Sequence, residues 1–174
     1  MDTIILRFRD LRTAPGGTLS AHAQTIQENG FTWWGWWRRP YEGLATDFLW
    51  QISDRCPLTI LLLDTGSLGD EFRLHRAVLD GIEITPTGSD IPSPDVAVTP
   101  SYYNDLRLSA WFKLSRIKLP PETGITSIKL LDLPTWPDKN DPELTTYRNL
   151  IVTSQVQLRR LDVTLWHAEI ELQP

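Results

Sequence analysis

The sequence has one cysteine and lacks a long apolar run. Because Cys56 stands alone among 174 residues, an internal disulfide and a cysteine-rich zinc site are both excluded. The first apolar run, residues 4–8, contains Arg7, and Arg9 follows it directly. No later stretch is long enough to cross a membrane. We therefore expect a cytoplasmic protein with no signal peptide and no membrane contact.

Positive charge is also scarce. Seventeen lysines and arginines face 22 acidic residues, which gives a net charge of −5 and a pI near 5.1. Binding to duplex DNA without sequence preference depends on a summed positive field, so we expect none. Residues 1–40 are the exception, with five arginines against three acidic residues. The acidic excess therefore lies in the remainder of the chain, and a small local site remains open.

Groupings of residues that carry catalysis are missing as well. The histidines at positions 22, 75 and 167 lie in different predicted elements and do not have metal-binding spacing. Neither a nucleophile elbow nor a glycine loop with its phosphate-binding lysine occurs. We expect no catalytic residues, no metal and no cofactor. His22 is typical of a half-buried histidine with satisfied hydrogen bonds, and His75 is expected to face solvent.

Tryptophan, in contrast, is abundant. Four of the eight tryptophans fall in the segment Trp33-Trp34-Gly35-Trp36-Trp37. In a strand, Trp33 and Trp37 would share one face with Gly35, while Trp34 and Trp36 would share the other. One pair can enter a core, and the second needs another covering layer or a ligand. Gly35 would leave a slot in which a planar group could approach the backbone.

Arg38 and Arg39 follow the tryptophans at once. Indoles beside guanidinium groups suit a nucleobase with its phosphate, because stacking contributes roughly 1 to 3 kcal/mol per base and arginine pairs with phosphate oxygens. The competing interpretation is that all four indoles are core residues of a strand covered on both faces. The sequence leaves both open.

Alternating and helical patterns divide the chain into strands and short helices around one core. A size of 174 residues with 41% hydrophobic content fits one domain, spanning residues 1–174, which can be a segment of a longer protein. The expected strands are 4–8, 31–37, 58–63, 71–84, 108–117, 128–133, 150–156 and 161–172. Helices are expected at about 18–29 and 43–52, and proline-rich loops at 85–101 and 134–142. The run 58–63 predicts a central strand that is buried on both faces and paired with the strand beginning near Phe72.

Three segments carry a resemblance to a known family: LTILLLDTGS (58–67), EFRLHRAVLDGI (71–82) and RLSAWFKLSRI (107–117). With the aromatic strand and helix before them, they resemble the core of the PUA-like superfamily, within it the EVE and YTH domains, over about residues 31–118. Cys56-Pro57 stands where that family usually has Gly-Asp. The resemblance implies an α+β fold, namely a mixed, mainly antiparallel β barrel flanked by short helices. It also implies a non-catalytic sensor that takes up a base, often a modified one, in an aromatic cage.

The expected ligand is a nucleotide, or a modified base in nucleic acid. The resemblance carries the cage over to Trp33, Trp34, Trp36, Trp37 and Trp111. The residues themselves add Arg38 and Arg39 at the rim, Asp64 and Ser67 for a base edge, and Tyr102 and Tyr103 as two phenols closing over the ligand. Ordinary turn and loop-packing roles remain open for Asp64, Ser67 and the two tyrosines. The alternative function is a protein interaction or oligomerisation module, or attachment to an effector domain, through exposed tryptophans.

Overall fold

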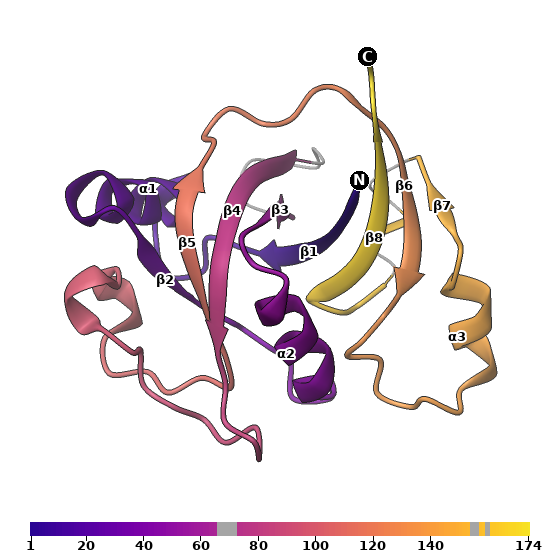
Figure 1. Ribbon diagram of the computed structural model, residues 1–174, viewed down its shortest axis with the longest axis horizontal. Coiled ribbons are helices and arrows are strands. Elements are labelled where there is room, and N and C mark those ends of the chain that lie inside the picture. The colour runs from indigo at the N-terminus through magenta and orange to yellow at the C-terminus, as the bar shows by residue number, and fades with distance from the viewer. Residues whose placement is uncertain (66–72, 154–156, 159–160) are drawn as a thin grey trace.

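The computed structural model describes residues 1–65, 73–153, 157–158 and 161–174 and shows a curved sheet with three short helices around it (Figure 1). Its main elements are β1 (Asp2–Phe8), α1 (Gly17–Asn29), β2 (Thr32–Gly35), α2 (Thr46–Asp54), β3 (Leu58–Asp64), β4 (Arg73–Glu83), β5 (Trp111–Ile117), β6 (Ile125–Asp132), α3 (Pro142–Tyr147), β7 (Ile151–Val152) and β8 (Leu165–Leu172). Single turns of 3₁₀ helix at Val96–Val98 and Ser101–Tyr103 lie in the connection between β4 and β5. Helix α1 packs against β2 and β5 at one end of the sheet, and α2 packs against β4.

The sheet has the strand order β2-β5-β4-β3-β1-β8-β6-β7. Only β1 and β3 pair in parallel, and the other described pairs are antiparallel. The mixed, mainly antiparallel α+β class is thus confirmed. The structure does not confirm a closed barrel. Strands β2 and β7, which are four and two residues long, stand at opposite ends of the sheet, and the sheet is open between them.

Strand β3 is the central strand that the apolar run 58–63 predicts. It lies between β1 and β4, and its antiparallel pairing with β4 agrees with the expected hairpin, although residues 66–72 lie outside the described part. Successive leucines point to different cores: Leu62 enters the cluster on one face and Leu63 the cluster on the other. His75 was expected to face solvent, but it pairs with Leu62 and is buried. A sheet that packs on both faces leaves its central strands no solvent side.

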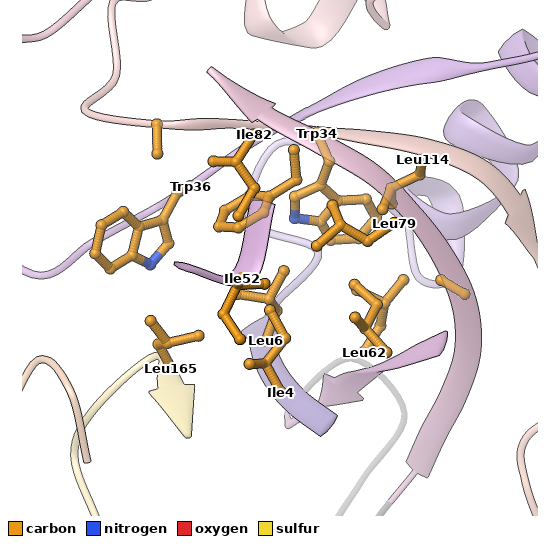
Figure 2. Close-up of a cluster of buried hydrophobic side chains, with 14 of the residues drawn as sticks. Ile4, Leu6, Trp34, Trp36, Ile52, Leu62, Leu79, Ile82, Leu114 and Leu165 are labelled. Atoms are coloured by element: carbon orange, nitrogen blue, oxygen red, sulfur yellow. The ribbon is translucent and has the colours of Figure 1, made fainter. Parts of the chain in front are cut away.

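Strand β2 also alternates between two covered faces. Trp34 and Trp36 enter the core that contains Leu62 and Leu114, as Figure 2 shows. Trp33 joins a separate cluster with Trp111. The second face is therefore covered by the chain itself, through the connection between β4 and β5, and a ligand is not needed to cover it.

The segment 134–142 was expected to be an irregular loop, but helix α3 begins at its end. The side chain of Asp141 accepts a hydrogen bond from the Glu143 N–H at 2.9 Å, and Pro142 occupies the first helical turn. An aspartate cap followed by proline is a normal helix start, but six residues are too few for a helical periodicity to show in the sequence. None of the helices in the described ranges combines the length and apolar content needed to cross a membrane.

Candidate functional site

A cavity of about 300 Å³ lies between the end of β1 with its following loop and the end of β2 with its following loop. Five arginines line it: Arg7, Arg9, Arg12, Arg38 and Arg39. The other described lining residues are Phe8, Leu11, Thr18, Trp34, Trp37, Pro40, Tyr102 and Thr164. Aromatic rings, guanidinium groups and hydroxyls therefore meet in one hollow, and none of these lining residues carries a carboxylate.

Asp10 holds the loop after β1, which carries Arg9 and Arg12, against the start of α1. Helix α1 begins at Gly17 after a Gly16 cap residue that has no side chain to accept the first N–H groups. The Asp10 carboxylate takes this role, accepting from Gly16 N at 2.9 Å and from Thr18 N at 3.0 Å. Thr18 lies in the first turn of the helix and lines the cavity. A negative charge at a helix N-terminus is also favourable.

The opposite wall is fixed by the carboxylate of Glu42, which is only 3% exposed. It accepts from the Thr164 N–H at 3.0 Å, from the Thr164 hydroxyl at 2.8 Å and from the Arg39 N–H at 3.1 Å, and Thr135 Oγ1 donates to it as well. A buried charge needs such a set of donors to offset its lost hydration. Glu42 thereby ties the loop after β2 to the start of β8.

The cavity arginines differ in their partners. Arg38 Nη1 donates to the carbonyl of Glu42 at 2.5 Å, and Arg39 Nη2 forms an ion pair with Asp162 at 3.2 Å. Arg7 Nε donates to Thr65 Oγ1 at 3.0 Å. Three other guanidinium nitrogens, Arg7 Nη1, Arg38 Nε and Arg39 Nε, are buried and find no hydrogen-bond acceptor among the described residues. Such groups are rare in folded proteins and call for an explanation.

Neighbouring charges also affect the pKa of Arg7. Burial lowers the pKa of this guanidinium, and the nearby positive charges of Arg39 and Arg9 lower it further. Like charges brought together in a partly buried site repel one another, and screening by water is weaker there. The inner end of the cavity is thus suited to an anion.

His22 lies fully buried behind the aromatic wall. Its ring stacks on Trp34, with centroids 4.4 Å apart and 28° between the planes. Nδ1 lies 3.1 Å from Thr32 Oγ1, whose hydroxyl donates to the Val98 carbonyl, so Nδ1 carries the proton and Nε2 is an acceptor. Burial lowers the pKa of His22 to about 3, which keeps the ring neutral at physiological pH. The expectation of a histidine with satisfied hydrogen bonds holds, with full burial in place of half burial.

Two tyrosine hydroxyls lie within reach of Nε2 of His22. The Tyr102 oxygen is 2.9 Å away and the Tyr103 oxygen 3.2 Å, and the latter also accepts the Gly35 N–H at 2.9 Å. A neutral imidazole offers a single lone pair, so one of the two phenol protons must find another acceptor. Burial raises the pKa of Tyr103 to about 12 and raises that of Tyr102 too, so both hydroxyls stay protonated. Tyr102 lines the cavity, and its hydroxyl is the nearer of the two to Nε2 of His22.

Trp37 stands between two planar groups. Tyr103 lies against it with centroids 5.8 Å apart and 12° between the planes, and the Arg12 guanidinium lies 5.2 Å from its ring centroid. Arg12 is exposed, and its long side chain can leave this position at little cost. Trp37 is therefore the indole of this strand that presents a face toward the cavity without a core residue on it.

The structure brings five of the sequence-predicted residues to the cavity, of which Trp34 is also buried in the core, and packs four more in the core away from the cavity. Those at the cavity are Trp34, Trp37, Arg38, Arg39 and Tyr102. Those packed in the core are Trp33, Trp36, Tyr103 and Trp111. Asp64 is buried at the end of β3 beside Thr65 and is not among the lining residues, and Ser67 lies outside the described residues.

The slot expected beside Gly35 is filled by the protein. A Cβ placed on Gly35 would lie 2.8 Å from Tyr103 Cε1 and 3.0 Å from Trp111 Cζ3, and Leu108 comes closer still. Gly35 therefore permits tight packing of side chains from β5 and the loop before it, and a ligand cannot enter there.

Sequence reasoning missed three cavity arginines and the carboxylate beneath them. The signal for Arg7, Arg9 and Arg12 was the excess of arginine in residues 1–40, which was noticed as a charge imbalance but was not assigned to a site. Glu42 gave no signal, because its donors Thr135 and Thr164 are about a hundred residues away in the chain. Among the described residues no cluster of three or more metal-ligating side chains occurs.

A protein-family model described as Pua-like matches residues 4–173, nearly the whole chain. The chain belongs to the Pua-like family. The match extends well beyond the segment 31–118 on which the resemblance rested, and it takes in the arginine-bearing strand β1 and the closing strand β8. Pua-like domains are generally non-catalytic binding domains, and the family points to binding of RNA or of bases. Searches among curated proteins and among solved structures found no match.

Proposed function

We propose that this Pua-like domain recognises a nucleotide or a nucleobase, modified bases included, without catalysing a reaction on it. The observation that carries the proposal is the cavity, in which five arginines and the rings of Trp37 and Tyr102 face one volume of about 300 Å³. Small-molecule sites are concave, largely apolar and contain a few convergent polar groups. A planar ring that carries negative charge has the chemistry to match both kinds of wall.

The base would stack on Trp37. The guanidinium of Arg12 is itself planar, and it now lies over the ring at a centroid distance of 5.2 Å. A base can replace it there, or enter between Arg12 and Trp37, because stacking on aromatic rings and on guanidinium planes is common to nucleotide-binding sites. The Tyr102 hydroxyl and Thr18 lie at the same cavity and are suited to read a base edge. Membership of the EVE and YTH branch, a sensor role and a cytoplasmic location belong to this proposal.

The alternative of a protein interaction surface made of exposed tryptophans has less support. All eight tryptophans lie in the described part of the chain, and Trp50 on α2, at 40%, is the only exposed one. The flat patch of indoles that this alternative requires is therefore absent from the described surface. A lone exposed tryptophan is ordinary in folded proteins.

Isothermal titration with nucleosides, nucleotides and base-modified forms tests the proposal, with Trp37→Ala as the informative variant. We expect Trp37→Ala to weaken binding by roughly 1 to 3 kcal/mol, the contribution of one stacked base. Trp50→Ala is the matched control, since it removes an exposed indole from another element, and it should bind as the parent does. If no member of the panel binds the parent, the proposal is wrong; equal binding by both tryptophan variants would remove Trp37 from the site.

A further inference from the structure

The positive charge inside the cavity exceeds what its surroundings neutralise. Of the nearby carboxylates, Asp162 pairs with Arg39, Asp10 binds the start of α1, and Glu42 is enclosed by its hydrogen-bond donors. Arg7 has a hydroxyl partner, Thr65, and no carboxylate within ion-pair distance in the described chain. The chain as a whole carries −5, so this positive cavity is a local departure from an acidic molecule.

The three buried guanidinium nitrogens without an acceptor among the described residues belong to residues that line the cavity. Arg7 comes from β1 in the middle of the sheet, and its Nη1 is buried with no acceptor among the described residues. Arg38 and Arg39 each bring a further buried Nε without such a partner. Three guanidinium groups with incomplete hydrogen bonding thus meet at one cavity, and an anion with several oxygens can accept from more than one of them.

A phosphate monoester and a phosphodiester meet this demand differently. A monoester carries about −1.5 to −2 charges at pH 7 and three terminal oxygens, so it can enter a closed end and accept from several arginines. A diester has one charge, and the strand must continue on both sides of it. Proteins that hold the interior of a strand use an open positive groove along the backbone. In this chain five arginines line one cavity of about 300 Å³.

We propose that the cavity binds a nucleotide through a terminal phosphate monoester, held by Arg7 and Arg39, and discriminates against nucleotides inside a strand. This inference rests on the proposed function, since the same cavity would stack the base on Trp37. The phosphate could belong to a free mononucleotide or to the 5′ end of a polynucleotide, which share this chemistry.

The experiment is isothermal titration of the full 174-residue chain with probes that share a base. The probes are ribonucleoside 5′-monophosphates, unmodified and methylated on the base, the matching nucleosides, and trinucleotides with and without a 5′-phosphate. We expect each bound monophosphate to bind roughly 10- to 100-fold more tightly than its nucleoside, the ratio expected for a charge-assisted hydrogen-bond set. A 5′-hydroxyl trinucleotide should bind no better than the nucleoside.

Arg7→Gln and a matched control separate the arginine from general charge. With Arg7→Gln, the affinity for the monophosphate should fall to the affinity for the nucleoside. With Arg116→Gln, at an exposed position on β5, the monophosphate should still bind more tightly than the nucleoside. Circular dichroism and a melting curve establish that Arg7→Gln is folded; if it is not, Arg39→Gln gives the same test from the other wall. Binding of the 5′-phosphorylated trinucleotide identifies a strand end as a source of the phosphate, and its failure to bind restricts the ligand to free nucleotides.

The outcomes that overturn the inference differ from those that overturn the proposed function. If 5′-hydroxyl trinucleotides bind as tightly as monophosphates, or if nucleosides do, the monoester site is wrong and base recognition stands. If no probe binds at all, both fail. If Arg7→Gln and Arg39→Gln leave the ratio of monophosphate to nucleoside affinity unchanged, the assignment of the phosphate to these two arginines is wrong.

Discussion

Two aromatic regions lie next to β2, and they differ in whether their buried hydrogen-bond donors find acceptors. The closed cluster consists of Trp33, Val98, Tyr103 and Trp111, all buried. Within it, Trp111 Nε1 donates to the Ile91 carbonyl at 2.9 Å, and the Tyr103 hydroxyl accepts from Gly35. The cavity next to it also has aromatic walls, yet three of its guanidinium groups have buried nitrogens without an acceptor among the described residues.

A high density of tryptophan therefore does not by itself mark a binding site. Large aromatic residues supply much buried area and fill a core well when their N–H and O–H groups find partners. In the closed cluster Trp111 Nε1 and the Tyr103 hydroxyl do. At the cavity, burial of charged donors without acceptors costs free energy that the fold must offset elsewhere, and a bound anion would remove this cost. Incomplete pairing of charge, more than the presence of rings, distinguishes the cavity.

The largest effect on stability should come from the closed cluster. Trp111→Ala removes a fully buried indole and leaves the Ile91 carbonyl without its donor, so it should lower the free energy of unfolding by about 3 to 5 kcal/mol. Urea denaturation followed by circular dichroism measures this value, with Trp50→Ala as the exposed control. A loss below about 1 kcal/mol would mean that the closed cluster is not a structural core.

Glu42 beneath the cavity should rank next. Glu42→Gln keeps the shape but replaces an acceptor of charge-assisted hydrogen bonds by an amide whose NH₂ group faces donors. We expect a loss of about 1 to 3 kcal/mol in the free energy of unfolding, together with weaker ligand binding because the loop holding Arg38 and Arg39 loosens. Glu28→Gln, on the exposed end of α1, is the control that changes the same charge elsewhere. Equal stability of the two variants would contradict the role given to Glu42.

His22 lies between the two regions, and its protonation should make the free energy of unfolding depend on pH. Its pKa is about 3 in the folded protein and 6.5 in the unfolded chain, so the unfolded chain takes up its proton first as pH falls. Stability from this residue is fully present above pH 6.5 and is lost below it, by up to about 1.4 kcal/mol per pH unit. Unfolding in urea at several values between pH 7.5 and 5 measures this slope. His22→Gln should flatten it over that interval; an unchanged slope would show that another group causes it.

A smaller stability effect is expected at the cavity wall. Trp37 is half-buried and stacks on Tyr103, so Trp37→Ala should cost about 1 to 2 kcal/mol, well below Trp111→Ala. The same denaturation series gives the ratio of the two losses. If Trp37→Ala unfolds the protein as readily as Trp111→Ala does, Trp37 belongs to the core and the distinction between the two regions fails.

No effect at all is expected with random duplex DNA. Five of the 17 lysines and arginines line one cavity, and the chain as a whole carries −5, so a gel-shift assay at about 0.15 M salt should show no submicromolar complex. Such a complex would mean that the arginines act as an open surface. The same assay repeated with Arg7→Gln would then show whether the cavity takes part.

Local sequence patterns are sufficient to predict the strands with strong apolar runs and the two buried faces of the aromatic strand. The run 58–63 gave the central strand, and the spacing of the indoles gave two faces, because side-chain alternation in a strand is a local property. The resemblance to the PUA-like superfamily added the α+β fold class. Short elements such as β7 and α3 were too brief to carry a pattern of their own.

Contacts between distant segments determine which aromatic residues are enclosed and where the charged side chains meet. Trp33 and Trp111 lie 78 positions apart and become one cluster through the pairing of β2 with β5, while β1 brings Arg7 to the loop that holds Arg39. Glu42 depends in the same way on Thr135 and Thr164. Local pattern fixes which side of a strand a residue faces, but burial and pairing depend on what distant segments place there, and no short window of sequence contains that information.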